Sequence, residues 1–458
     1  MPWCLSWNEK HCLKSPPFFR FMQVPPDKHA VVLAYYFPPL GLSGVQRVAK
    51  LVKYLPLFGW KVTVITPEPG SYFAFDEQLL AEVSDNPNIR IERTRSWDPT
   101  RLKKSSGTNL IPFPEETSRK LFSTLSQWVL VPDNKIGWKR FAVKRAIECH
   151  TQTPFDLVFA TAPPYTSFIV GREVATKLGI PLVLDYRDDW IGNPRHLYPT
   201  FWHKKKNQLF ERQAIRASKL VFSINDQIAQ AIQNRHPEYA SRVSVVPQGF
   251  DPEDFQSHPT SINEHDSAKS PRKMTFLYAG VFYDAQQPDS FLTALHRLFE
   301  RRPELKNKVQ ARFVGLFPES GKRLIEQLGL AFATEMTGYV DHNESVSALL
   351  DCDVAWMIVG RQKGEEGIST GKLFEYFGSR KPILGLVPEG AARDALIQYG
   401  NATCVFPDDV ESISAAIEAL IIDWQNGDLS LADAENTEPY NRKKQAAHIA
   451  SLFDQIVL

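Results

Sequence analysis

Short apolar runs alternate with helical patterns along most of this chain of 458 residues, and that alternation limits the possible folds more than any other feature. The first unit is an apolar run at residues 30–36, a helical pattern that begins at Val45, and a second apolar run at residues 61–66. Continuous apolar runs of this length predict strands that are buried on both faces of a parallel sheet. A strand, a helix and a strand joined by short connections predict a right-handed parallel crossover.

The alternation occurs twice, and a polar stretch at residues 256–273 separates the two halves. We therefore predict an N-terminal α/β domain over residues 29–255, an interdomain linker over 256–273 and a C-terminal α/β domain over 274–439, each with a doubly wound parallel sheet. Residues 1–28 lack the continuous apolar stretch of a signal peptide, and we interpret them as a disordered or mis-assigned leader. Ligands of such sheets bind at the carboxyl ends of the strands, so we expect the chemistry in the cleft between two facing domains.

The composition argues against several classes of protein. The 53 lysines and arginines nearly balance the 52 aspartates and glutamates, whereas a nucleic-acid binder needs a basic surface. The five cysteines are odd in number and no two have CxxC spacing, which indicates reduced thiols in a cytoplasmic protein. The sequence contains no run of 18 apolar residues that would span a membrane, and no HxxxH pair that would indicate a metal site.

A glycine-containing connection follows the first predicted strand. Gly41 and Gly44 bracket a short segment before the helix that begins at Val45. Glycine allows close approach of the backbone to an anion, and a helix N-terminus supplies free N–H groups, so this segment could contact a phosphate or a sugar. It could equally be a plain connection. It is not the GxGxxG fingerprint, and no acidic residue clearly ends the second strand, which argues against a dehydrogenase.

A stronger pattern lies at residues 367–378, which read Gly-Ile-Ser-Thr-Gly-Lys-Leu-Phe-Glu-Tyr-Phe-Gly. Ser369, Thr370 and Gly371 are expected to open a helix whose amides and hydroxyls can hold a diphosphate. Lys372 falls in the first turn, where a cation is unfavourable unless an anion lies nearby. Glu375 follows one turn later and can accept two hydrogen bonds from a ribose diol. The alternative is a capped helix with a surface Lys–Glu pattern.

This segment, followed by Ser-Arg-Lys-Pro-Ile-Leu at 379–384, resembles the donor-binding motif of the retaining glycosyltransferase family 4, whose members have the GT-B fold. The resemblance covers about residues 29–458. Four further segments agree with it: Tyr-Phe-Pro-Pro-Leu-Gly at 36–41, Leu-Asp-Tyr-Arg-Asp-Asp-Trp at 184–190, Val-Pro-Gln-Gly-Phe-Asp at 246–251, and a terminal helix at 440–457.

The resemblance implies two facing Rossmann-like domains, with a last helix at 440–458 that crosses back to the N-terminal domain. It implies transfer from a nucleotide-sugar without a metal ion or a cofactor. The residues that it points to as donor-binding are Gly41, Gly44, Gly280, Glu366, Ser369, Thr370, Gly371, Lys372 and Glu375, where Glu375 would bind the ribose and Gly44 would close on the diphosphate from the other domain. The candidate catalytic residues are Arg187, Asp188, Lys372 and Glu375.

The sequence departs from the family pattern at two places. The first glutamate of the paired-glutamate motif is replaced by Gly367, although Glu365 and Glu366 come just before it. The Arg and Lys that many members place after the first two strands of the C-terminal domain are not evident. The basic residues that could stand in for them are Lys322, Arg361 and Lys363.

Two further patterns each allow two interpretations. Arg187 and Asp188, at the end of a predicted strand, could position an acceptor, or they could belong to an internal salt bridge that holds the loop. Aromatic residues at 121–138, followed by basic residues at 139–145 and accompanied by the lysines at 204–206, suit a membrane interface. They are also compatible with a solvated basic face around a buried tryptophan.

We therefore expect a retaining glycosyltransferase that moves a sugar from a UDP-sugar or GDP-sugar to a glycan or lipid-linked acceptor, in cell-envelope or exopolysaccharide biosynthesis. The expected location is the cytoplasm, with possible peripheral contact at the inner membrane surface. Two alternatives stay open at this point: a non-catalytic partner protein with the GT-B fold, and a nucleotide-sugar epimerase or hydrolase.

Overall fold

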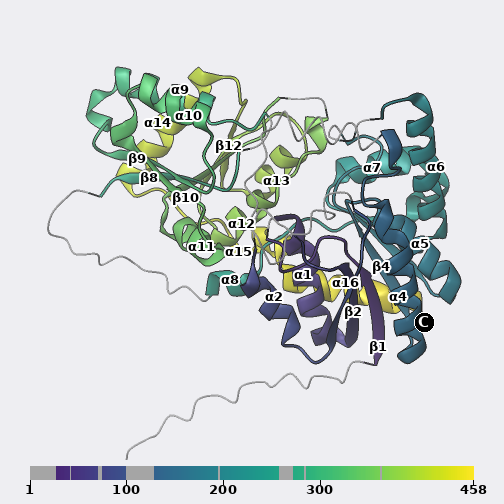
Figure 1. Ribbon diagram of the computed structural model, residues 1–458. Helices are drawn as coiled ribbons and strands as arrows, with labels where there is room; N and C mark the ends of the chain where they lie inside the picture. Colours follow the sequence, from purple (N-terminus) through teal and green to yellow (C-terminus); the bar gives the residue numbers. More distant parts are fainter. Residues whose placement is uncertain are drawn as a thin grey trace, which may run out of the picture.

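Two α/β domains, each built on one parallel sheet, make up the computed structural model, as the repeated alternation predicted (Figure 1). The structure describes residues 27–41, 43–70, 75–98, 128–193, 196, 198–256, 272–282, 285–361 and 364–457. Most of the predicted leader and most of the predicted linker lie outside these ranges. Of the helices in the described ranges, none combines the length and the apolar character that crossing a bilayer requires.

The N-terminal domain has a seven-stranded sheet with the order β3-β2-β1-β4-β5-β6-β7. The chain runs outward from β1 to β3 and then returns to place β4 beside β1, so the connections after β1 and β4 diverge and leave a crevice at their carboxyl ends. The strands are β1 (Lys28–Leu33), β2 (Trp60–Pro67), β3 (Ile89–Thr94), β4 (Leu157–Ala162), β5 (Leu182–Tyr186), β6 (Leu220–Ser223) and β7 (Val243–Val245). The helices are α1 (Ser43–Tyr54), α2 (Glu77–Ser84), α4 (Lys139–Gln152), α5 (Thr166–Leu178), α6 (Phe201–Ala217) and α7 (Asp226–Arg235).

The C-terminal domain has a six-stranded sheet with the order β10-β9-β8-β11-β12-β13, and its chain reverses between β8 and β11. The strands are β8 (Met274–Ala279), β9 (Val309–Val314), β10 (Thr334–Gly338), β11 (Val354–Ile358), β12 (Ile383–Leu386) and β13 (Ala402–Val405). The helices are α9 (Asp289–Arg301), α10 (Glu319–Gln327), α11 (His342–Asp351), α12 (Gly371–Ser379), α13 (Ala391–Tyr399), α14 (Val410–Asn426) and α15 (Ala434–Thr437).

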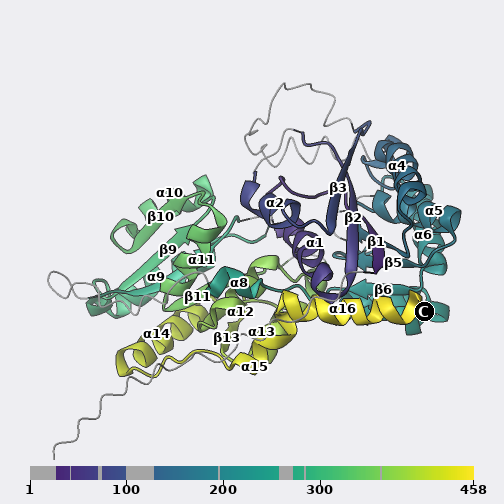
Figure 2. The same cartoon turned by 90° about the horizontal axis from the view of Figure 1, so that it is seen from below.

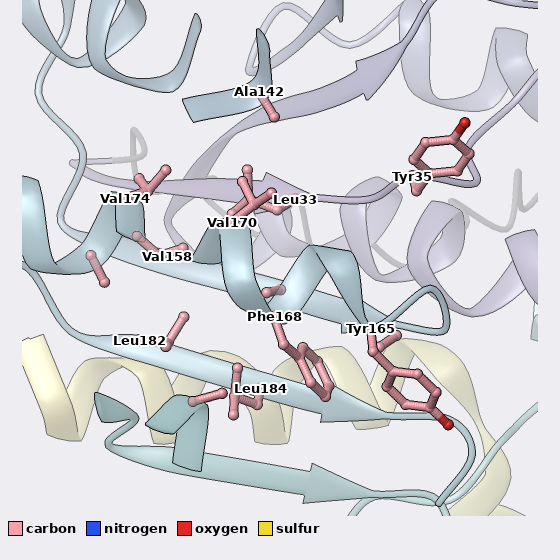
Figure 3. Packing of buried hydrophobic residues seen from close by; sticks show 14 of the residues in the cluster. Leu33, Tyr35, Ala142, Val158, Tyr165, Phe168, Val170, Val174, Leu182 and Leu184 are labelled. Atoms are coloured by element: carbon pink, nitrogen blue, oxygen red, sulfur yellow. The ribbon is translucent and has the colours of Figure 1, made fainter. Parts of the chain in front are cut away.

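Apolar cores on both faces of each sheet explain why the strands read as continuous apolar runs. Figure 3 shows one face of the N-terminal sheet, where Leu33, Val158 and Leu182 lie under the side chains of α5. Gly171 of α5 has no Cβ, and a Cβ there would lie 2.8 Å from the Cβ of Ala160. The missing side chain therefore allows α5 to pack closely on β4.

The last helix, α16 (Arg442–Val457), leaves the C-terminal domain and packs across the N-terminal domain (Figure 2). Its Ile449 and Phe453 are buried in the same core as α1, which gives the crossover expected of the GT-B fold. Phe250 lies in the other segment of the chain that joins the domains, beside Asn441, and is buried in the core of the C-terminal domain. Asp251 and Asp254, which follow it, contact Lys50 of α1, so this segment packs against both domains.

Candidate active site

The N-terminus of α12 carries polar groups that lack partners. Thr370 is the N-cap residue, with extended backbone angles, and its side chain caps no amide. The hydroxyl oxygens of Ser369 and Thr370 are buried, and neither has a hydrogen-bond partner within the described part of the chain. Buried polar groups normally find a partner, and a helix N-terminus presents free N–H groups and positive potential. Unpartnered hydroxyls at a helix N-terminus are the kind of groups that bind anions.

Lys372 lies in the first turn of α12, and its ammonium is held by the first strand of the domain. Its Nζ donates to Oη of Tyr278 at 2.5 Å and to the carbonyl oxygen of Val281 at 2.6 Å. Burial lowers the pKa of Lys372 to about 7, although the charge of Glu375 opposes this change. Gly280 has a φ of +133°, and a Cβ there would lie 2.4 Å from Cε of Lys372. Glycine at this position therefore leaves the space in which the lysine side chain lies.

Glu375 is half-buried in the second turn of α12. Its charge favours the charged forms of His342 and of Arg442, the first residue of α16, so it lies near both. Burial alone would lower the pKa of His342, but its hydrogen bond with Asp254 at 2.9 Å and the charge of Glu375 raise this pKa to about 9. Burial lowers the pKa of Arg442 to about 10. The carboxylate of Glu375 thus lies near two cations, which also interact with Asp254.

The loop that contains Gly367 touches the N-terminal domain. Nδ2 of Asn225, the N-cap residue of α7, donates to the carbonyl oxygen of Gly367 at 3.1 Å. Nε2 of Gln227, in the N-terminal domain, also donates a hydrogen bond to Oδ2 of Asp394, in the C-terminal domain, at 2.7 Å. A Cβ at 367 would lie 4.0 Å from Ile228, which is an ordinary contact distance, so packing does not require glycine at this position. Glu366 is exposed and follows Glu365 in the short 3₁₀ helix of residues 365–367.

Arg187 connects two loops of the N-terminal domain. Its guanidinium donates to the carbonyl oxygens of Gly44, in the first turn of α1, and of Pro163, directly after β4. A Cβ on Gly44 would lie 3.3 Å from Nη1 of Arg187, so these two predicted site residues are adjacent. Burial lowers the pKa of Arg187. Gly41 is buried in the same loop, and Asp188 is half-buried beside Arg187.

A buried ion pair that the sequence reasoning missed lies under this site. Arg47 of α1 contacts both carboxylate oxygens of Asp185, with the shortest distance, 2.7 Å, from Nη2 to Oδ1. Asp185 also accepts from Oγ1 of Thr161 at 2.8 Å. Ion pairs thus do hold the 185–190 segment, since Asp189 also contacts Arg235 at 2.5 Å. An acceptor-positioning role for Arg187 and Asp188 stays a prediction.

Two family models match adjoining parts of the chain. The glycosyl transferase 4-like domain matches residues 44–249, and the glycosyl transferases group 1 domain matches residues 261–444. The chain is a family 4 glycosyltransferase with the GT-B fold. The non-catalytic alternative is therefore not supported. Comparison with curated protein sequences gives no match.

Solved structures agree with the fold of this glycosyltransferase. The HepE protein of Anabaena, solved with UDP and glucose, is 16% identical, with a TM-score of 0.57, over 93% of this chain and 99% of that one. A glycosyltransferase of Rickettsia africae is 13% identical, with a TM-score of 0.62, over 94% of this chain and 99% of its own. Sucrose-phosphate synthase of Thermosynechococcus elongatus is 15% identical, with a TM-score of 0.59, over 93% and 98% of the two chains.

The basic residues considered as replacements for the family's Arg and Lys are engaged elsewhere. Lys322 contacts Glu319 at 2.5 Å, and Arg361 contacts Asp408 at 3.3 Å. Lys363 lies outside the described residues. Within the described ranges, no three His, Cys, Asp or Glu side chains are grouped so that they could hold a metal ion. Lys372, by contrast, lies in the first turn of α12 itself.

Proposed function

We propose that this glycosyltransferase moves a sugar from a UDP-sugar or GDP-sugar to a glycan or lipid-linked acceptor, with retention of configuration and without a metal ion. The observation that carries the proposal is the N-terminus of α12, where the buried hydroxyls of Ser369 and Thr370 lack partners. A diphosphate would supply acceptors to these hydroxyls and to the free amides that begin at Gly371. The same groups would stabilise the charge that develops on the leaving diphosphate.

Glu375 and Lys372 support the same assignment. Glu375 comes one turn after the helix N-terminus, so its carboxylate can accept hydrogen bonds from the ribose diol while the diphosphate lies at the helix end. A diphosphate would favour the charged form of Lys372, whose pKa burial lowers to about 7. Gly44 and Arg187 would approach the donor from the N-terminal domain, and Asp188 would face the acceptor.

The neighbouring structures make a uridine nucleotide the first candidate. The Anabaena protein was solved with UDP and glucose, and MnaA of Staphylococcus aureus, which is 13% identical with a TM-score of 0.51, was solved with UDP. We assign the acceptor to the class of envelope or extracellular polysaccharides, on the family resemblance. Catalysis would rest on positioning the two substrates and on stabilising the leaving group.

A thermal-shift screen against UDP-, GDP-, ADP- and dTDP-sugars tests the donor site. A ligand that binds only the folded state raises the melting temperature, so one nucleotide class should give a clear rise. Glu375→Ala should abolish that rise. Glu389→Ala, which removes an exposed glutamate of the same domain, should preserve it.

No rise with any of the four classes would contradict the proposed donor. A rise that persists in Glu375→Ala would contradict the assigned site. Product analysis then separates the reaction types, because a transferase needs an acceptor for rapid release of the nucleotide. Rapid release without any acceptor would support an epimerase or hydrolase instead.

A further inference from the structure

The helices α4, α5 and α6 concentrate positive charge on one layer of the N-terminal domain. Together they carry eleven lysines and arginines but only three glutamates and no aspartate, whereas the whole chain has a net charge of +1. The three helices lie side by side on the side of this domain that is away from the C-terminal domain (Figure 1). Five of these eleven residues form ion pairs with glutamates, so the unpaired positive charge of this layer lies mainly on α6.

Exposed apolar side chains gather at the start of α6. Phe201 and Trp202 are 63% and 75% exposed, and Trp128 and Val129 are 53% and 80% exposed. Trp128 lies beside this first turn of α6, because the ring of His203 lies 6.0 Å from that of Trp128 and its Nε2 lies 3.2 Å from the Trp128 carbonyl oxygen. Exposed aromatic side chains this close together are uncommon on a surface with no partner.

Lysines continue this patch along the same helix. Lys204, Lys205 and Lys206 are all exposed, and none of them forms an ion pair within the described residues. Nζ of Lys205 lies 4.7 Å from the ring centroid of Phe201, so charge and aromatic surface are adjacent. We call Trp128, Val129, Phe201, Trp202 and Lys204–Lys206 the aromatic–lysine surface.

The sequence pointed to this region only in part. Trp138, one of the aromatic residues in the predicted interface, is buried and donates Nε1–H to Thr94 at 2.8 Å. Residues 121–127 lie outside the described residues. The exposed aromatics at the start of α6 were not predicted, because their exposure depends on how the helix packs.

The aromatic–lysine surface lies at the cleft edge of the domain. Helix α6 runs from the carboxyl end of β5 back to the start of β6, so its first turn lies at the edge of the sheet where Arg187 and Asp188 follow β5. Trp190 fixes the connection, since its carbonyl oxygen accepts from Tyr198 at 2.7 Å and its Nε1 donates to Asn207 of α6 at 3.0 Å.

We propose that the aromatic–lysine surface docks the enzyme on a membrane leaflet that contains anionic lipids. Trp and Phe side chains lie at the headgroup level of bilayers, and exposed lysines are attracted to the negative potential of such a leaflet. A soluble polyanion would account for the lysines, but not for Val129 and the two exposed tryptophans beside them. Docking here would bring the acceptor side of the cleft to the bilayer, and it does not depend on which donor the enzyme uses.

Vesicle co-sedimentation of the full chain tests this surface. We expect binding to vesicles of phosphatidylcholine with 30% phosphatidylglycerol, little binding to pure phosphatidylcholine, and release at high salt. Lys204→Gln/Lys205→Gln/Lys206→Gln should weaken binding on the order of 100-fold, from roughly five-fold per lysine. Phe201→Ser/Trp202→Ser should weaken it by roughly ten-fold or more.

Matched variants of exposed residues in the C-terminal domain control for charge and for apolarity. Lys306→Gln/Lys308→Gln/Arg323→Gln removes three charges, and Ile397→Ser/Leu431→Ser removes two exposed apolar side chains. Both should bind like the unmodified chain, with unchanged melting temperatures in all variants. Failure of the unmodified chain to bind anionic vesicles would overturn the proposal. So would equal loss in the control variants, or tight binding to poly(A) RNA that depends on the lysines but not on Phe201 and Trp202.

Discussion

The ion pair between Arg47 and Asp185 should be a large contributor to the stability of the N-terminal domain. Its side chains are only 8% and 2% exposed, and the guanidinium also donates to the carbonyl oxygen of Pro247 at 2.7 Å. Asp185→Asn removes the negative charge and leaves the guanidinium buried without its counter-ion. Breaking a buried pair in this way costs roughly 3–5 kcal/mol. At roughly 2–4 °C per kcal/mol for a domain of this size, the melting temperature should fall by about 6–20 °C.

Differential scanning calorimetry measures this change, and urea unfolding followed by tryptophan fluorescence provides the free energy. Glu238→Gln is the matched control, because its ion pair with Arg212 is exposed and should contribute little to the stability. Arg47→Met/Asp185→Leu should cost less than the sum of the two single changes, since no unpaired charge remains. A loss below about 1 kcal/mol in Asp185→Asn would refute the view that the pair is buried and tightly coupled.

Three further predictions concern the site. The folded pKa of His342, about 9, lies above its usual value of 6.5, so its interaction with Asp254 stabilises fully below pH 6.5 and is lost as the pH rises to 9. Relative to His342→Gln, the unmodified chain should lose on the order of 3 kcal/mol at most across this window, measured by urea unfolding at each pH. The pKa of Lys372 is lowered to about 7, so donor binding above pH 7 should take up a proton, seen by calorimetry in buffers of different ionisation enthalpy and absent in Lys372→Met. Gly280→Ala should weaken donor binding by roughly ten-fold or more, because a Cβ would displace Lys372, while Gly329→Ala, where nothing lies within 4 Å, should leave affinity unchanged.

The fold could be predicted from the sequence because buried parallel strands leave a local signal. Runs such as Ala30–Leu33 must be apolar on both faces, and the helices between them show a period of their own. The packing of the segment that joins the two domains left no such signal. Phe250 and Phe255 are apolar residues near the end of the first half, and only the packing shows that they belong to the C-terminal domain.

The candidate site, like the fold, could be predicted from the sequence only in part. Ser369, Thr370, Lys372 and Glu375 lie within seven residues of one another, so their spacing on one helix could be interpreted directly. The partners that complete the site are distant in the sequence. Tyr278 is 94 residues from Lys372, Asn225 is 142 residues from Gly367, and Arg47 is 138 residues from Asp185. A single sequence carries no record of such pairings, which arise from the order of the strands.

A crystal structure of the chain with the nucleoside diphosphate selected by the thermal-shift screen tests the donor site most directly. We expect the diphosphate oxygens to lie about 2.7–3.2 Å from the hydroxyls of Ser369 and Thr370 and from the amide of Gly371, with the ribose diol bound to Glu375. A diphosphate bound elsewhere in the cleft, with both hydroxyls still without partners, would contradict it.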